Sequence, residues 1–127
     1  MKTLLVADDD PVMLKLFEFN LRKAGFQVIA CKEGLGVVQK ALTEKPELVI
    51  LDYLLPGRSG LELIHDFKAN ARLSEVPLII VTGQGKGTTR DDLMRAGAAC
   101  VFTKPFSPSL LVQEINRLLT RPVESVR

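Results

Sequence analysis

Two hydrophobic patterns alternate along this chain: short continuous apolar runs, and longer stretches in which apolar residues recur at helical spacing. A continuous run of strand length is typical of a strand buried on both faces of a sheet. The runs lie at residues 3–7, 26–30, 48–52, 78–82 and 98–103. The strongest of them ends in the carboxylate of Asp52, and the turn Leu55-Pro56-Gly57 follows. We therefore predict five strands, the third of which ends in a charged residue.

The stretches between these runs carry helix signals at their ends. They predict helices at about residues 11–24, 35–44, 60–67, 89–95 and 107–119. Pro11 suits the first turn of a helix, and Gly25 suits the position just after its end. Ser59 followed by Glu62 three residues later is a capping box. The buried stripe of the first helix is expected at Met13, Leu16, Phe17, Leu21 and Ala24.

The alternation of strands and helices predicts the fold class. Strands that are each followed by a helix form a parallel sheet with right-handed crossovers, because the helices must return across its faces. We predict an α/β three-layer sandwich of the flavodoxin-like type, with a five-stranded parallel sheet in the order 2-1-3-4-5 and five helices.

Composition excludes several classes of function. The chain has 127 residues, enough for one domain, and 17 Lys and Arg against 15 Asp and Glu, without a basic cluster that would indicate nucleic-acid binding. It has neither an apolar run of membrane-spanning length nor a signal-peptide cleavage pattern. Cys31 and Cys100 lack metal-binding spacing and are expected to be buried free thiols. Free thiols fit a reducing compartment, so we predict a cytoplasmic protein.

Polar and charged residues stand where the predicted strands end. They are Asp8, Asp9 and Asp10 after the first strand, Asp52 after the third, Thr82 after the fourth and Lys104 after the fifth. In the order 2-1-3-4-5 the first and third strands are neighbours, so their carboxylates meet. Two carboxylates about 5 Å apart repel by roughly 3 kcal/mol at an effective dielectric constant near 20. Lys104 and a hard cation such as Mg²⁺ would compensate this charge, which points to phosphoryl transfer.

The chain resembles the receiver domain of two-component response regulators, of the stand-alone chemotaxis-like type, over residues 2–120. Each motif that carries the resemblance is weak alone, but their order and placement at strand ends are specific. The motifs are Asp8-Asp9, Asp52 with Leu55-Pro56-Gly57, Ser59-Gly60-Leu61-Glu62, Val81-Thr82-Gly83 and Lys104-Pro105-Phe106. Residues 121–127 are expected to be a tail or the start of a linker.

The resemblance implies a role for each site residue. Asp52 would take a phosphoryl group from a phosphohistidine, on a histidine kinase or a histidine phosphotransfer protein. The expected protein ligands of Mg²⁺, which Mn²⁺ can replace, are Asp9 directly, Asp8 mainly through water, and the backbone carbonyl of Leu54.

The resemblance also implies a switch. Lys104 and Thr82 would bind phosphoryl oxygens, with the small Gly83 leaving Thr82 room to move. Such a domain regulates through its own phosphorylation and dephosphorylation and is not an enzyme acting on other substrates. Its partners are proteins, with no direct contact to nucleic acid or membrane, and the downstream target is not specified by the sequence.

The chain departs from the family pattern at two positions. Val101 stands three residues before the lysine, where the family carries an aromatic switch residue, and Phe102 should point to the opposite face of its strand. We hypothesise that mobility of the glycine-rich loop 84–87 replaces aromatic rotation. Leu54, two residues after the acceptor, can screen attacking water and predicts a long-lived phosphoaspartate.

Other interpretations stay open. One is a pseudo-receiver that is not phosphorylated and acts only by binding partners. Another follows from Asp8-Asp9-Asp10-Pro11-Val12, which also fits the nucleophile motif of haloacid-dehalogenase-like phosphatases. Asp10 is expected to be a helix cap, and His65 an exposed residue. Phe19 and Leu14, partly off the expected core stripe, are either ordinary exposed residues or a docking patch for the phosphodonor.

Overall fold

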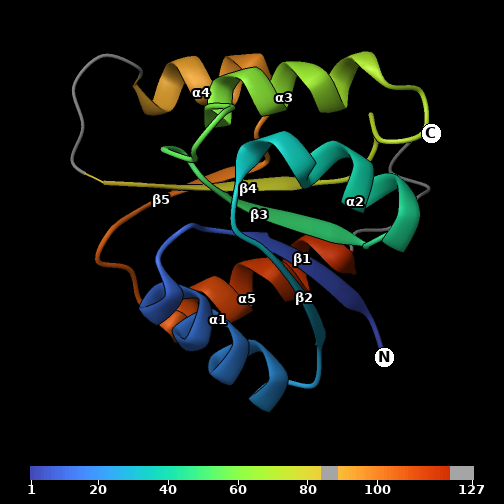
Figure 1. Cartoon of the computed structure of the whole chain (residues 1–127). Coiled ribbons are helices and arrows are strands. Elements are labelled where there is room, and N and C mark those ends of the chain that lie inside the picture. Colours follow the sequence, from blue (N-terminus) through green and yellow to red (C-terminus); the bar gives the residue numbers. More distant parts are fainter. Residues whose placement is uncertain (84–88, 121–127) are drawn as a thin grey trace.

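The computed structural model describes residues 1–83 and 89–120, which form a parallel sheet covered by helices on both faces (Figure 1). The strands are β1 (Thr3–Ala7), β2 (Gln27–Cys31), β3 (Leu48–Asp52), β4 (Leu78–Thr82) and β5 (Cys100–Thr103). The α-helices are α1 (Pro11–Lys23), α2 (Val37–Glu44), α3 (Gly60–Ala69), α4 (Arg90–Ala96) and α5 (Pro108–Leu119), and a 3₁₀ turn, η1 (Gly34–Gly36), precedes α2.

The strand order confirms the predicted topology. The sheet runs β2-β1-β3-β4-β5 and every pair is parallel. From β1 the chain adds β2 on one side and then β3, β4 and β5 on the other, so the switch point of the sheet lies between β1 and β3, which are hydrogen-bonded neighbours. In open α/β sheets, ligand sites lie outside the carboxyl ends of the strands at this switch point. The fold therefore brings the ends of β1 and β3 together there.

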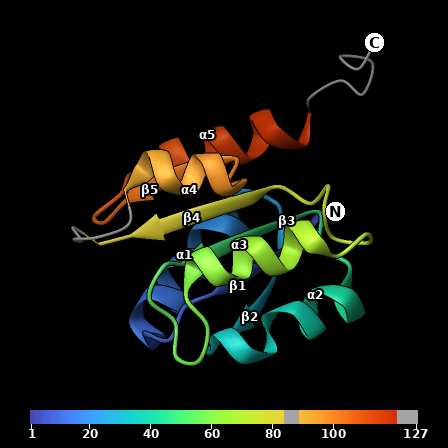
Figure 2. The same ribbon diagram turned by 90° about the horizontal axis from the view of Figure 1, so that it is seen from above.

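Two hydrophobic cores cover the two faces of the sheet. Helices α1 and α5 pack on one face of the sheet and α2, α3 and α4 on the other (Figure 1). Figure 2 looks onto the face that α2, α3 and α4 cover. Side chains alternate along a strand, so β3 contributes to both cores. Leu48 and Ile50 face the core under α1 and α5, and Val49 and Leu51 face the core under α2, α3 and α4. All of β3 is buried, which explains why its sequence is apolar throughout until Asp52.

Capping residues define the helix ends as predicted. The Asp10 side chain accepts a hydrogen bond from the Val12 N–H and caps α1. The Ser59 and Glu62 side chains form the complete capping box of α3. After α1, Gly25 adopts φ 99°, a conformation that favours glycine over residues with a side chain.

The buried stripe of α1 differs from the predicted one. Leu14, Phe17 and Leu21 are buried, whereas Leu16 is 41 % exposed. The prediction was wrong because the apolar residues of this helix allow two neighbouring stripes, and packing against α5 and the sheet selects the one at positions 14, 17 and 21. Leu14 therefore belongs to the core, while Phe19 is 66 % exposed with the Lys23 ammonium over its ring.

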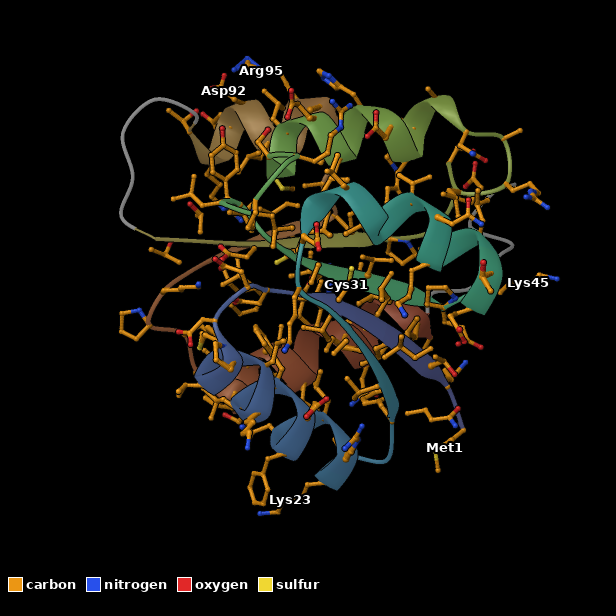
Figure 3. The ribbon with its side chains drawn as sticks, in the orientation of Figure 1. Met1, Lys23, Cys31, Lys45, Asp92 and Arg95 are labelled. Carbon is orange, nitrogen blue, oxygen red and sulfur yellow. The ribbon has the colours of Figure 1, made fainter. Side chains whose placement is uncertain are left out.

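Smaller differences concern element boundaries and one cysteine. The predicted helix at 35–44 begins as η1 and becomes α2 only at Val37. The second and fifth strands begin one and two residues later than predicted. Cys31 is buried and points into the interior (Figure 3), but Cys100 is only partly buried; both are free thiols. Among the helices of the described residues, none is both long and apolar enough to cross a membrane.

Candidate functional site

The predicted acidic residues meet at the carboxyl edge of the sheet. Asp8 directly follows β1, and Asp52 is the last residue of β3. One carboxylate oxygen from each of Asp8, Asp9 and Asp52 can be chosen such that all three lie within 4.8 Å of one another. Adjacent parallel strands that end together are what place these charges side by side.

Asp8 is the most deeply buried member of this cluster. It is 0 % exposed, and its Oδ1 accepts the N–H of Asp10 at 2.9 Å. Its own N–H donates to the Cys31 carbonyl at 3.0 Å, which extends the pairing of β1 with β2. Its second oxygen, Oδ2, is buried without a hydrogen-bond partner. Asp9, in contrast, is exposed at the mouth of the site.

Lys104 supplies the positive charge of the site. Its Nζ lies 3.3 Å from Asp52 Oδ2 and 3.5 Å from Asp8 Oδ2. The Lys104 N–H donates to the Thr82 carbonyl at 2.8 Å, which ties the end of β5 to the end of β4. One ammonium thus faces two buried carboxylates, leaving a net negative charge in the site.

Thr82 and Leu54 flank the carboxylates. The Thr82 hydroxyl donates to the Gly83 carbonyl at 3.1 Å, so its bond is made to its own loop and not to the acidic cluster. A Cβ added at Gly83 would meet no atom of residues 1–83 and 89–120 within 4 Å, so these residues leave space beside it. The Leu54 N–H faces Asp52 Oδ1 at 3.4 Å, while the Leu54 side chain is 71 % exposed.

The environment of Asp52 disfavours its ionised form. Burial raises the pKa of the Asp52 carboxyl, and the nearby charge of Asp8 raises it further. Lys104 acts in the opposite direction by attraction and hydrogen bonding, without reversing the shift. Ionised Asp52 is therefore held in the folded protein at a cost in stability, and a cation added to the site would relieve that cost.

A pH-dependent gain in stability is expected for Asp52→Asn in the presence of a chelator. Because the pKa of Asp52 is higher in the folded than in the unfolded state, the folded state binds more protons between these values and loses stability as pH rises through them. Asparagine carries no charge and no such cost. We therefore expect the free energy of unfolding of the Asp52→Asn protein at neutral pH to exceed that of wild type by about 1 kcal/mol, because the variant loses part of the repulsion between neighbouring carboxylates.

Urea denaturation at several pH values measures this difference. It should disappear below the ordinary pKa of aspartate, about 3.9. Asp91→Asn, at an exposed aspartate in the first turn of α4, is the matched control and should change stability by less than about 0.5 kcal/mol. An Asp52→Asn protein less stable than wild type at neutral pH would contradict this account of the site.

The donor set of the site fits a hard divalent cation. Three carboxylates converge, and Asp8 Oδ2 is a buried anionic oxygen with no hydrogen-bond donor. Mg²⁺ prefers oxygen ligands, binds through one or two carboxylates and keeps several waters, which the exposed side of Asp9 allows.

Comparison with known proteins agrees with this arrangement. The sequence model of the response regulator receiver domain matches residues 4–116. The chain belongs to this family. Receiver domains are regulatory signalling domains of two-component systems, so the predicted family, fold and signalling role are confirmed.

Curated relatives include regulators of transcription. The chain is 31 % identical over 120 residues to the phosphate regulon transcriptional regulatory protein PhoB of Pseudomonas aeruginosa, covering 94 % of this chain and 52 % of PhoB. It is also 31 % identical to the alkaline phosphatase synthesis transcriptional regulatory protein PhoP of Bacillus subtilis, covering 94 % of this chain and 49 % of PhoP. The chain thus spans about half the length of these relatives.

Solved structures share the fold over nearly the whole chain. A response regulator described as putative, from Chloroflexus aurantiacus, matches with a TM-score of 0.88 and 32 % identity, covering 94 % of this chain and 98 % of that one. The receiver domain of the sensor histidine kinase PA1611 from Pseudomonas aeruginosa, with magnesium coordinated in its active-site cleft, matches with a TM-score of 0.86, 24 % identity and the same coverage.

The structure brings most of the predicted site residues together. Asp8, Asp9, Asp52 and Lys104 form one cluster, and Asp10 is a helix cap, as predicted. His65 is exposed, and the loop hypothesis for residues 84–87 falls outside the described residues.

Some contacts near the site were not predicted. Val101 and Phe102 pack against opposite cores, as expected, but Phe106, two residues after Lys104, stacks on Phe17 of α1. Only the aromatic residue following Lys104-Pro105 hinted at this contact in the sequence, because the partner ring lies on a distant helix.

Proposed function

We propose that Asp52 is the phosphoacceptor of this receiver domain and that a histidine kinase or histidine phosphotransfer protein is its donor. The observation that carries this proposal is the convergence of three carboxylates and Lys104 at one edge of the sheet, beside its switch point. In the reaction, an Asp52 oxygen forms a bond to phosphorus while the bond from phosphorus to the donor histidine nitrogen breaks. The nitrogen leaves with the electron pair and takes up a proton.

Each site residue has a part in this step. Lys104 Nζ, 3.3 Å from Asp52 Oδ2, is placed to bind an oxygen of the arriving phosphoryl group. Asp8 and Asp9 would hold Mg²⁺, for which Mn²⁺ can substitute, together with the backbone carbonyl of Leu54. When bound, the metal would neutralise charge on the phosphoryl oxygens. The magnesium in the cleft of the PA1611 receiver domain supports this assignment.

Thr82, Gly83 and Val101 are proposed as switch positions. The Thr82 hydroxyl bonds only weakly to its own loop, at 3.1 Å, and the open space beside Gly83 leaves it room to rotate towards a phosphoryl group. A doubly charged group at Asp52 would attract this hydroxyl and bias the loop after β4. Valine has no ring to rotate at position 101, so the second half of the family's usual relay would have to differ here.

The proposed role is regulatory. Phosphorylated Asp52 would alter a protein-binding surface, and the chain would act as a signalling domain and not as an enzyme on other substrates. The domain would extend over residues 2–120, with 121–127 as a tail or linker. Transcription regulators such as PhoB are about twice as long, so an output through DNA, attached to this domain, is one proposal for the whole protein. The two free thiols fit the predicted cytoplasmic location.

Intact-protein mass after incubation with Mg²⁺ and acetyl phosphate tests the proposal. Wild type should gain one phosphoryl group only when Mg²⁺ is present, and Asp52→Ala should gain none. A wild-type protein that gains none with metal and donor present would favour the pseudo-receiver interpretation instead.

The phosphatase interpretation makes a different demand on the acidic residues. It would use Asp8 as nucleophile and require further acidic residues in the site. Asp92 instead forms the capping box of α4 with Thr89 and pairs with Arg95 on the outer surface of that helix (Figure 3). Asp8, deeply buried and hydrogen-bonded to the Asp10 N–H, is less open to a substrate than Asp52. The geometry therefore favours Asp52 as the acceptor.

Leu54 is expected to lengthen the life of the phosphoaspartate. Its exposed side chain lies two residues beyond Asp52 and presents no polar atom that could orient a water molecule towards phosphorus. A Leu54→Asn variant adds such an atom, and we expect it to lose its phosphoryl group about tenfold faster, less than the roughly 10²–10⁴-fold typical of a general base because an amide orients the water without taking its proton.

Decay of the phosphorylated mass after removal of donor measures this lifetime. Leu35→Asn, at another exposed leucine on η1, is the matched control and should leave the decay rate unchanged. Equal decay rates of wild type and Leu54→Asn would count against the screening role.

A further inference from the structure

Three phenylalanine rings form a cluster behind the lysine of the site. Phe106, two residues after Lys104, stacks on Phe17 of α1 with ring centroids 5.2 Å apart and an interplanar angle of 16°. Phe102 of β5 meets the edge of Phe106 at 6.4 Å and 75°. Offset and edge-to-face pairs at these distances stabilise a structure beyond the apolar area that they bury.

The segment after Lys104 has few other attachments. Among the described residues, the backbone hydrogen bond that ties residues 104–106 to another element runs from the Lys104 N–H to the Thr82 carbonyl. Pro105 has no N–H and is exposed. Apart from the ion pairs of the Lys104 ammonium, Phe106 is the side chain that packs this segment against α1 and β5, through Phe17 and Phe102.

Helix α1 is also attached to the acidic half of the site. Asp10 caps its first turn, and the Asp10 N–H donates to Asp8 Oδ1 at 2.9 Å. The same helix thus contacts the buried carboxylate through its N-terminus and the lysine segment through Phe17, two turns further along. One helix thus contacts both the acidic and the basic side of the site.

We infer that Phe17 and Phe106 are positioning residues for the phosphorylation reaction, which hold Lys104 at the distance from Asp52 where it can bind a phosphoryl oxygen. This inference rests on the proposed function of Asp52. Phosphoryl transfer is governed by positioning and charge, and a displacement of about 1 Å in such a site can slow a reaction by up to about 100-fold. The cluster lies on the face of β5 opposite Val101, so it is separate from the position of the missing switch aromatic.

Leucine substitutions test the inference because they remove a ring while keeping an apolar side chain. We expect Phe17→Leu and Phe106→Leu each to lower the rate of phosphorylation by saturating acetyl phosphate and Mg²⁺ by about tenfold. Phe67→Leu is the matched control: Phe67 is fully buried on α3 in the other core, so it should lose stability in the same way and keep the wild-type rate. Circular dichroism at the assay temperature confirms that each variant is folded, and Phe106, being only partly buried, is the milder of the two sites.

A double-mutant cycle with Lys104 separates positioning from a general loss of structure. If the rings act through the lysine, Phe17→Leu should change the rate less than twofold in a Lys104→Met background. An effect of Phe17→Leu that persists undiminished in that background, or an equal effect of Phe67→Leu, would overturn the inference.

The same experiment distinguishes this inference from the proposed function. Wild type that is phosphorylated on Asp52 while both leucine variants react at its rate would overturn the positioning role alone. Wild type that gains no phosphoryl group would overturn the proposed function, and the inference with it.

Discussion

A Lys104→Met variant is expected to accept phosphoryl groups from acetyl phosphate about 100-fold or more slowly than wild type. The Lys104 ammonium lies 3.3 Å from Asp52 Oδ2, so it is in reach of an oxygen on a group bound to that carboxylate. Removing one charged donor from a preorganised site of this kind costs roughly 10²–10³ in rate. Methionine keeps the length of the apolar stem, so the effect reports the charge.

Metal binding distinguishes this loss from misfolding. Lys104 competes with a cation for the Asp8 and Asp52 carboxylates, so Lys104→Met should bind Mg²⁺ at least as tightly as wild type. The rate is measured from intact mass over time at saturating donor. Lys40→Met, at an exposed lysine of α2, removes the same charge away from the site and should react like wild type. A Lys104→Met protein with the wild-type rate would remove Lys104 from the mechanism.

Mg²⁺ is expected to stabilise the folded protein strongly. Binding to the folded state alone adds about 2.7 kcal/mol to the free energy of unfolding at a concentration 100 times the Kd. The physical source is the relief of repulsion among Asp8, Asp9 and Asp52 and a partner for the buried Asp8 Oδ2. Urea unfolding with and without Mg²⁺ measures the gain.

Two neighbouring aspartates provide a matched pair for this experiment. Asp9→Asn removes one charge from the cluster and should greatly weaken the stabilisation by Mg²⁺. Asp10→Asn should keep it, because Asp10 caps α1 and asparagine is an equally good cap. Equal stabilisation of both variants would show that the metal does not bind through Asp9.

The sequence predicted the sheet well because each strand is a continuous apolar run and each crossover is a helix with its own capping signals. β3, buried along its whole length, is the clearest case, and its Asp52 marks the site edge. The choice of buried stripe in α1 was not predictable, since Leu14 and Leu16 are equally apolar and only packing against the neighbouring elements decides between them.

The site was predictable as a set of strand ends but not as a geometry. Strand order alone brings Asp8 and Asp52 together, because β1 and β3 are neighbours that end at the same edge. Lys104 follows β5, two strands from β3, and reaches both carboxylates with its long side chain. The complete burial of Asp8, the lack of a hydrogen bond to its Oδ2 and the raised pKa of Asp52 depend on how the chain packs around them. The stacking of Phe106 on Phe17 joins residues far apart in sequence, for which no local pattern exists.

The most direct test of the central claim identifies which carboxylate carries the phosphoryl group. Borohydride reduces an acyl phosphate to an alcohol, so treatment of the phosphorylated protein converts a phosphorylated aspartate into homoserine, which peptide mass mapping can locate. The account predicts homoserine at position 52 alone, in samples that received both Mg²⁺ and donor. Homoserine at position 8, with residue 52 unchanged, would contradict it and make Asp8 the nucleophile.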